Sequence, residues 1–228
     1  MNFSIIADNI GIYFFGLKNT LILVSVSLSI GLVFAIPLAV LRTSKNILIS
    51  GPINAYTYFF RGTPLLVQMF LIYYGMGQFE TIKASFLWPF FREAYFCALF
   101  AFTLNTCAYT IEIIRGAIEN TPHGEVEAAK AAGMSLYLRF TRIILPSAFR
   151  RALPTYGNEI IFMLHGSSLA SVITIIDITG AARIINSRYY TPYEAFITAG
   201  AFYLTITFIL VWLLKKLEYR WLAHLRRE

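Results

Sequence analysis

The sequence predicts an all-α integral membrane protein with five membrane-spanning helices. Of its 228 residues, 57% are hydrophobic and only 14% are charged, and the mean hydropathy is +0.64. These values are far from those of an ordinary globular domain. The apolar residues also gather into separate blocks of about 20 residues, the length that a helix needs to cross a bilayer. We therefore expect residues 1–228 to form a single membrane domain.

The five predicted spans are apolar blocks separated by polar connections, at residues 20–41, 52–77, 95–114, 156–176 and 196–214. The first block contains no charged residue, and only Glu112 interrupts the third. Arg61-Gly62-Thr63-Pro64 interrupts the second block. Because proline has no backbone N–H to donate, we expect this helix to kink or to begin anew near Pro64.

The distribution of basic residues predicts the orientation of the chain. Lys and Arg are concentrated after the first span, after the third span and in the C-terminal tail, which includes Arg226 and Arg227. Connections rich in Lys and Arg stay in the cytoplasm. We therefore expect the N-terminus outside and the C-terminus in the cytoplasm.

Residues 117–154 form the longest predicted cytoplasmic connection, and a loop of this length is uncommon without structure of its own. Helix-favouring Ala, Glu and Lys fill residues 125–132. We expect one short helix here, ended by Gly133, and a second up to Pro146. Two interpretations remain open: contact with a soluble partner, or an amphipathic hairpin that rests on anionic lipid through its arginines.

Several classes of function are not supported. The net charge is +7, and the Lys and Arg residues lie between the apolar blocks. A nucleic-acid-binding protein needs these residues on one solvated face, so we expect no nucleic-acid partner. The sequence has no phosphate-binding loop, so we expect no ATP site, cofactor or catalytic residue on this chain. Its three histidines are widely separated, and this pattern predicts no metal site.

The cytoplasmic connection carries a spaced motif: Glu127-Ala128-Ala129, three residues, Gly133, nine residues, Ile143, one residue, then Leu145-Pro146. This motif resembles the loop signature of permease subunits of binding-protein-dependent ABC importers. The resemblance implies that the helix beginning at the motif lies in a groove of an ATPase subunit and transmits its closure to the membrane helices. The implied coupling residues are Glu127, Ala128, Ala129, Gly133, Leu145 and Pro146.

Two further stretches, residues 61–68 and residues 105–116, resemble the polar amino-acid permeases. The sequence around Gly157-Asn158-Glu159 and residues 164–169 looks most like the M-type subunit of histidine/lysine/arginine/ornithine importers and of octopine, nopaline or arginine systems. The resemblance implies a multi-pass protein of the bacterial inner membrane that carries a basic amino acid. The implied partners are a paralogous permease, two copies of an ATPase that holds ATP and Mg, and a soluble or lipid-anchored binding protein.

Polar residues inside the predicted spans are candidates for the substrate path, because an ionisable side chain at bilayer depth is costly. A carboxylate could pair with a cationic cargo, and Glu159 is the leading candidate. The other candidates are Asn158, His165, Ser167, Ser168 and Glu112. Alternatively, Glu159 and Asn158 hydrogen-bond a neighbouring helix or Arg61, Arg61 anchors its helix at the phosphate layer, and Asn105 bonds across helices.

Two other functions stay open from the residues alone. The first is a gated channel or ion-coupled carrier that needs no ATPase, and the second is a membrane scaffold that transports nothing. Transport that persists in ATP-depleted vesicles and follows an ion gradient would indicate the first. A scaffold would tolerate the replacement of Glu159 and Asn158 by apolar residues.

Overall fold

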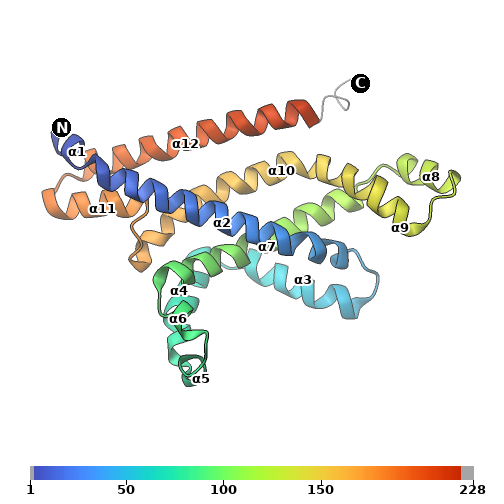
Figure 1. Ribbon diagram of the computed structural model, residues 1–228, viewed down its shortest axis with the longest axis horizontal. Helices are drawn as coiled ribbons and strands as arrows, with labels where there is room; N and C mark the ends of the chain where they lie inside the picture. The colour runs from blue at the N-terminus through green and yellow to red at the C-terminus, as the bar shows by residue number, and fades with distance from the viewer. Residues whose placement is uncertain (1–2, 222–228) are drawn as a thin grey trace.

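The computed structural model describes residues 3–221, which contain helices and no strand (Figure 1). Four long helices run along the longest axis of the molecule: α2 (Ile10–Arg42), α7 (Ala94–Glu119), α10 (Leu145–Gly166) and α12 (Pro192–Trp221). Of these, α2, α7 and α12 are each long and apolar enough to cross a membrane. A fourth candidate is the pair Leu136–Ile173 and Ile178–Tyr189, bent by 43°. The predicted all-helical membrane fold is confirmed.

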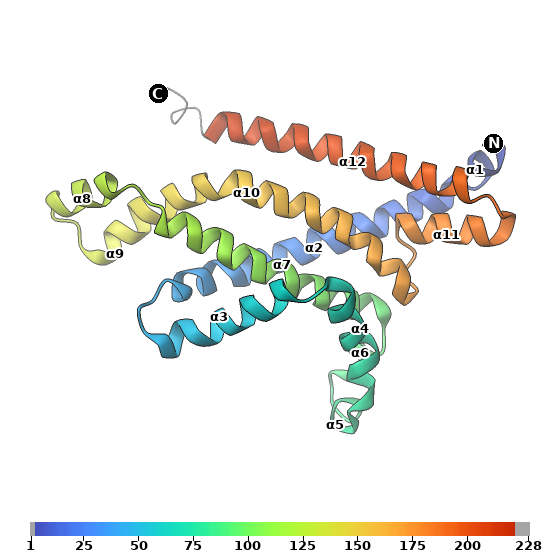
Figure 2. The ribbon, with the colours of Figure 1, turned by 180° about the vertical axis from the view of Figure 1, so that it is seen from behind.

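Shorter elements connect the long helices. They are α1 (Ser4–Asp8), α3 (Ile47–Gly62), α4 (Leu65–Gly75), a 3-10 turn (Met76–Gln78), α5 (Glu80–Lys83), α6 (Trp88–Phe91), α8 (His123–Ala131), α9 (Leu136–Arg139), a π turn (Phe140–Ile144), a 3-10 helix (Ser167–Ile173) and α11 (Ile178–Tyr189). In both views α8 and α9 lie at one end of the molecule and α1 and α11 at the other, while α4 to α6 project sideways (Figures 1 and 2).

The predicted interruption of the second block is confirmed. Helix α3 ends at Gly62 and α4 begins at Leu65, with Thr63 and Pro64 extended between them. Neither half is long enough to cross a membrane alone. Pro64 has no backbone N–H to donate, and its ring disfavours the helical conformation at Thr63, the residue before it. These two effects account for the position of the break.

Two helices extend beyond the predicted spans. The first helix begins at Ile10 rather than Thr20. The segment before Thr20 is helical because it packs on the far end of the chain, where the buried Tyr13 hydroxyl donates to the carbonyl of Ala195 at 2.7 Å. The fourth helix begins at Leu145 rather than Tyr156, and it becomes a 3-10 helix after Gly166. Thr174 then stops that helix in a left-handed conformation with φ of 75°.

The second short helix of the cytoplasmic connection does not end at Pro146. The chain stays helical from Leu136 through the π turn into α10. Pro146 directly follows the π turn, and its missing N–H removes one intrahelical hydrogen bond there without ending the helix. Of the basic tail used to predict orientation, Arg226 and Arg227 lie outside the described residues.

The core lies where α2, α4, α7 and α10 meet. Buried Leu23, Met69, Phe102 and Leu164 come from these four helices in turn. Helix α2 lies close against α7, since a Cβ added at Gly31 would lie 2.7 Å from Cγ2 of Thr106. Small residues at helix contacts allow such close approach in membrane proteins. This core sets the positions of α7 and α10, which carry the polar residues described next.

Candidate permease site and coupling loop

The connection over residues 117–154 places its motif residues on two elements. Helix α8 contains Glu127 and Ala128, which are exposed, and Ala129, which is 5% exposed. Gly133 follows the helix with φ of +72°. The half-buried Leu145 and the exposed Pro146 begin α10 instead. The motif therefore joins an exposed helix at one end of the molecule to the start of a long helix.

A cavity of about 580 Å³ lies between the α3–α4 break, α7 and α10. Its lining residues are Arg61, Leu65, Asn105, Tyr109, Ile113, Thr155, Asn158, Glu159, Phe162 and Met163. The structure thus brings the candidates Glu159 and Asn158 together with Arg61. Glu159 is only 6% exposed. The guanidinium of Arg61 lies 5.4 Å from the centre of the Tyr109 ring, a distance at which a cation is attracted to the ring face.

A second cavity, of about 480 Å³, adjoins the first and is more polar. The two share Arg61, Tyr109, Ile113 and Thr155, and the second adds Glu112, Arg115, Gly116, Ala117, Asn120, Arg151 and Ala152. The lining residues of α7 extend from Asn105, in the middle of the helix, to Asn120, just after its C-terminal end and before α8. Together the two cavities extend from Glu159 to the end of α7 that leads into α8.

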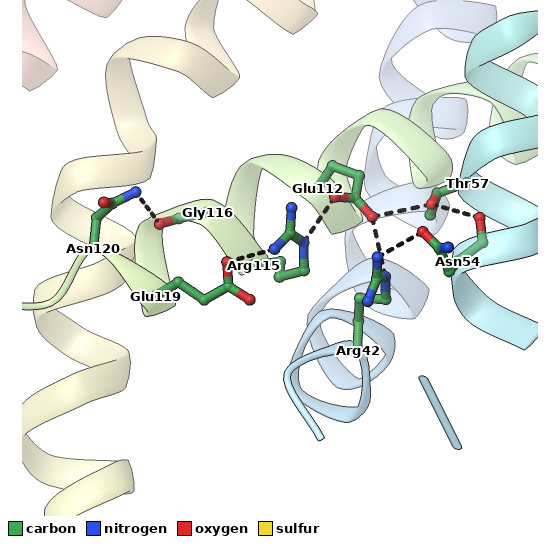
Figure 3. A network of polar contacts seen from close by, with 8 residues as sticks. All are labelled: Arg42, Asn54, Thr57, Glu112, Arg115, Gly116, Glu119 and Asn120. Carbon is green, nitrogen blue, oxygen red and sulfur yellow. Dashed lines mark hydrogen bonds and ion pairs between the residues drawn. The ribbon is translucent and has the colours of Figure 1, made fainter. Parts of the chain in front are cut away.

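Glu112 lines the second cavity, but its carboxylate is fully engaged within the protein (Figure 3). One oxygen accepts from Thr57 Oγ1 at 3.0 Å and pairs with Arg42 Nε at 3.4 Å. The other oxygen pairs with Arg115 Nε at 2.8 Å, and Arg115 also pairs with Glu119. Glu112 therefore joins α2, α3 and α7, and this geometry supports a structural role.

Three other candidates do not line either cavity. His165 is exposed, and its Nε2 lies 3.3 Å from Thr207 Oγ1 of α12. The hydroxyls of Ser167 and Ser168 donate to the backbone carbonyls of Leu164 and His165, at 2.6 and 2.7 Å. His165, six residues after Glu159, lies on another face of the α-helix, and Ser167 and Ser168 lie beyond the point where α10 becomes a 3-10 helix.

Tyr109 and Thr155 line the cavities but were not among the predicted site residues, although the helical spacing of the sequence indicates them. Thr155, Asn158, Glu159 and Phe162 follow the spacing i, i+3, i+4 and i+7 of one helical face. Most lining residues of α7 follow the same spacing, whereas Arg115 and Ala117 lie beside this face; those that follow it are Asn105, Tyr109, Glu112, Ile113, Gly116 and Asn120. Reading these periods together would have identified Tyr109 and Thr155. Arg61 comes from the distant α3 and carries no such signal.

The comparisons with known proteins match this architecture. The family model described as "Binding-protein-dependent transport system inner membrane component" matches residues 27–222. This chain belongs to that family. Its members are the membrane components of ABC importers, which work with separate ATPase subunits and a substrate-binding protein. The predicted permease subunit, rather than an enzyme, is confirmed.

Among curated proteins, the permease resembles the nopaline transport system permease protein NocM of Agrobacterium fabrum, with 47% identity over 99% of this chain and 94% of that protein. The histidine/lysine/arginine/ornithine transport system permease protein HisM of Escherichia coli is 48% identical over 95% of this chain and 91% of that protein. A solved amino acid ABC transporter shares 33% identity with a TM-score of 0.87, covering 96% of this chain and 99% of its own. An ATPase-independent channel or carrier is not favoured.

Proposed function

We propose that this permease subunit carries basic amino acids into the cell through the bacterial inner membrane. The cargo named for the HisM relative, histidine, lysine, arginine and ornithine, supports this proposal. The observation that carries it is the placement of Glu159, because a nearly buried carboxylate that faces a cavity offers a counter-charge to a cationic side chain. Arg61 faces the same cavity and has the opposite charge, which suits the carboxylate of an amino acid.

The proposed topology has five spans, with the broken pair α3 and α4 forming the second, in a single domain over residues 1–228. Helix α12 runs from the α11 end toward the α8 end (Figure 1). This direction supports an N-terminus outside and a C-terminus in the cytoplasm, with residues 117–154 as the cytoplasmic coupling loop. The pore is completed by a second permease, which we propose to be a paralogue.

The proposed coupling element is α8, with Glu127 and Ala128 against the ATPase and Gly133 ending the helix. Exposed small and charged side chains at the tip of the molecule leave room for a partner to approach closely. Leu145 and Pro146 transfer the movement to α10, which carries Glu159. ATP and Mg are held by two copies of the ATPase, and a soluble or lipid-anchored binding protein delivers the cargo.

The cargo assignment is tested by uptake into vesicles that contain the complex purified from its own host. Glu159→Gln removes the counter-charge but keeps the shape of the side chain. We expect the KM for arginine uptake to rise about tenfold or more, since a charge-assisted hydrogen bond contributes about 1.5–3 kcal/mol. Glu80→Gln is the matched control, because Glu80 lies on the exposed helix α5. An unchanged KM in Glu159→Gln would contradict the cargo role.

The coupling assignment is tested in the same vesicles with Glu127→Arg. We expect the variant subunit to insert and assemble, but to lose ATP-driven uptake, because the added positive charge and bulk lie on the exposed face of α8. Uptake and cargo-stimulated ATPase activity at the wild-type level would contradict the assignment. Uptake that persists in ATP-depleted vesicles would indicate an ion-coupled carrier instead.

A further inference from the structure

A chain of hydrogen bonds links α8 to α10 beside the coupling motif. Glu125 lies in the first turn of α8, and its carboxylate accepts a hydrogen bond from the Ser147 hydroxyl of α10 at 2.8 Å. The same Ser147 oxygen accepts a hydrogen bond from Nη1 of Arg151, one helical turn further along α10. A hydroxyl has one proton to donate and lone pairs to accept with. The chain therefore runs in one direction, from Arg151 through Ser147 to Glu125.

The other end of the Arg151 guanidinium holds the last turn of α7. Its Nη2 donates to the carbonyl of Ala117 at 3.1 Å and to Oγ1 of Thr121 at 2.8 Å. Carbonyls in the last turn of a helix have no intrahelical donor, and the negative end of the helix dipole favours a cation there. One planar group thus ties the end of α7 to the start of α10 and, through Ser147, to α8.

Arg151 also faces the transport path. It lines the 480 Å³ cavity, together with Glu112 and Asn120. Its neighbours on α10, Ala148 and Ala152, are buried in a hydrophobic cluster with residues of α7 and α2. The backbone around Arg151 is therefore firmly packed. The two terminal nitrogens of its side chain reach Ser147 of α10 and the C-terminal end of α7. A shift of α8 that pulls Glu125 acts directly on a side chain in the cavity wall.

We propose that Glu125, Ser147 and Arg151 form a strut that transmits movement of α8 to the inner cavity, with Arg151 as a positioning residue. This inference rests on the proposed contact between α8 and the ATPase. The strut needs the geometry of arginine, because its two terminal nitrogens donate to different elements at once. A lysine ammonium on a flexible stem presents a point charge and cannot hold both directions.

The test uses the purified complex in vesicles with its binding protein, and it measures arginine taken up per ATP hydrolysed. Ser147→Ala removes the bridging hydroxyl, Ser147→Thr keeps it, and Arg151→Lys keeps only the charge. Arg150→Lys is the matched control, since Arg150 is the exposed neighbour on the same helix. Basal ATPase activity and the amount of assembled complex are measured for each variant.

We expect Ser147→Ala and Arg151→Lys to assemble, and Ser147→Ala to keep wild-type basal ATPase activity. Their uptake per ATP should fall about tenfold, the size of a typical coupling between sites, while Ser147→Thr and Arg150→Lys stay near wild type. Unchanged uptake per ATP, or a loss of assembly that Ser147→Thr shares, would overturn the proposal. Absence of ATP-driven uptake by the wild-type complex would instead refute the proposed function, so the two failures are distinguishable.

Discussion

Nδ2 of Asn105 donates a hydrogen bond to Oε1 of Gln68 at 3.0 Å, which joins the middle of α7 to the first turns of α4. Nε2 of Gln68 in turn donates to the carbonyls of Phe60 and Thr63, at 2.8 and 3.0 Å. The break at Pro64 deprives these carbonyls of helical donors. The two amides therefore donate to carbonyls that the break leaves without helical donors, as buried backbone groups require. This explains why Asn105 sits in an apolar helix.

Replacing Gln68 with leucine should destabilise the permease. The variant leaves the carbonyl of Thr63 without its side-chain donor and the carbonyl of Phe60 with only Asn105 Nδ2 at 3.3 Å, and an unsatisfied buried polar group costs about 1–3 kcal/mol. We expect a lower thermal unfolding temperature of the detergent-solubilised complex. Gln78→Leu, at an exposed position after α4, should leave that temperature unchanged. Equal melting of Gln68→Leu and wild type would show that the break is satisfied in another way.

Gly16→Ala should destabilise the end of the molecule that carries α1 and α11. An added Cβ would lie 2.5 Å from the carbonyl oxygen of Asp177, and backbone cannot move aside cheaply. Overpacking of this kind costs about 1–3 kcal/mol, which thermal unfolding of the complex would detect. Gly11→Ala is the control, because nothing lies within 4 Å of its added Cβ. If both variants melt alike, α2 does not pack on the Asp177 turn as described.

Gly133→Ala should loosen the end of α8. Gly133 N–H bonds to the carbonyl of Lys130, and Met134 N–H to that of Ala129, which forms a Schellman cap around the left-handed residue. A non-glycine residue in this conformation costs about 1–2 kcal/mol. We expect faster hydrogen exchange of the α8 amides in Gly133→Ala and a smaller change in Gly133→Asn. Gly124→Ala has open space around it, and it should not speed exchange.

Glu112→Gln should lower stability without changing cargo recognition. The substitution leaves Arg42 and Arg115 without a carboxylate that is only 11% exposed, and we expect a loss of about 1–3 kcal/mol. The KM for arginine uptake should stay at the wild-type value, in contrast to Glu159→Gln. Glu119→Gln, at a side chain that is 50% exposed, should cost less. A raised KM in Glu112→Gln would return this residue to the substrate path.

The helical membrane class, the break at Pro64 and the end of α8 before Gly133 can be predicted from the residues alone. Each depends on local chemistry: apolar composition, a missing N–H, and a backbone conformation that glycine adopts easily. Local chemistry did not determine where helices begin and end. Residues 10–19 form helix because Tyr13 and Gly16 pack on distant segments, and the helix continues through Pro146 rather than ending there.

Which polar residues share a site depends on how the helices pack, and local residue patterns do not predict it. Arg61, Tyr109 and Glu159 lie on three elements far apart in sequence, and packing of α3, α7 and α10 brings them around one cavity. The same packing separates Ser167 and Ser168 from Glu159, although they lie close in sequence. A sequence pattern records the face of one helix, whereas a cavity depends on how several helices turn those faces toward each other.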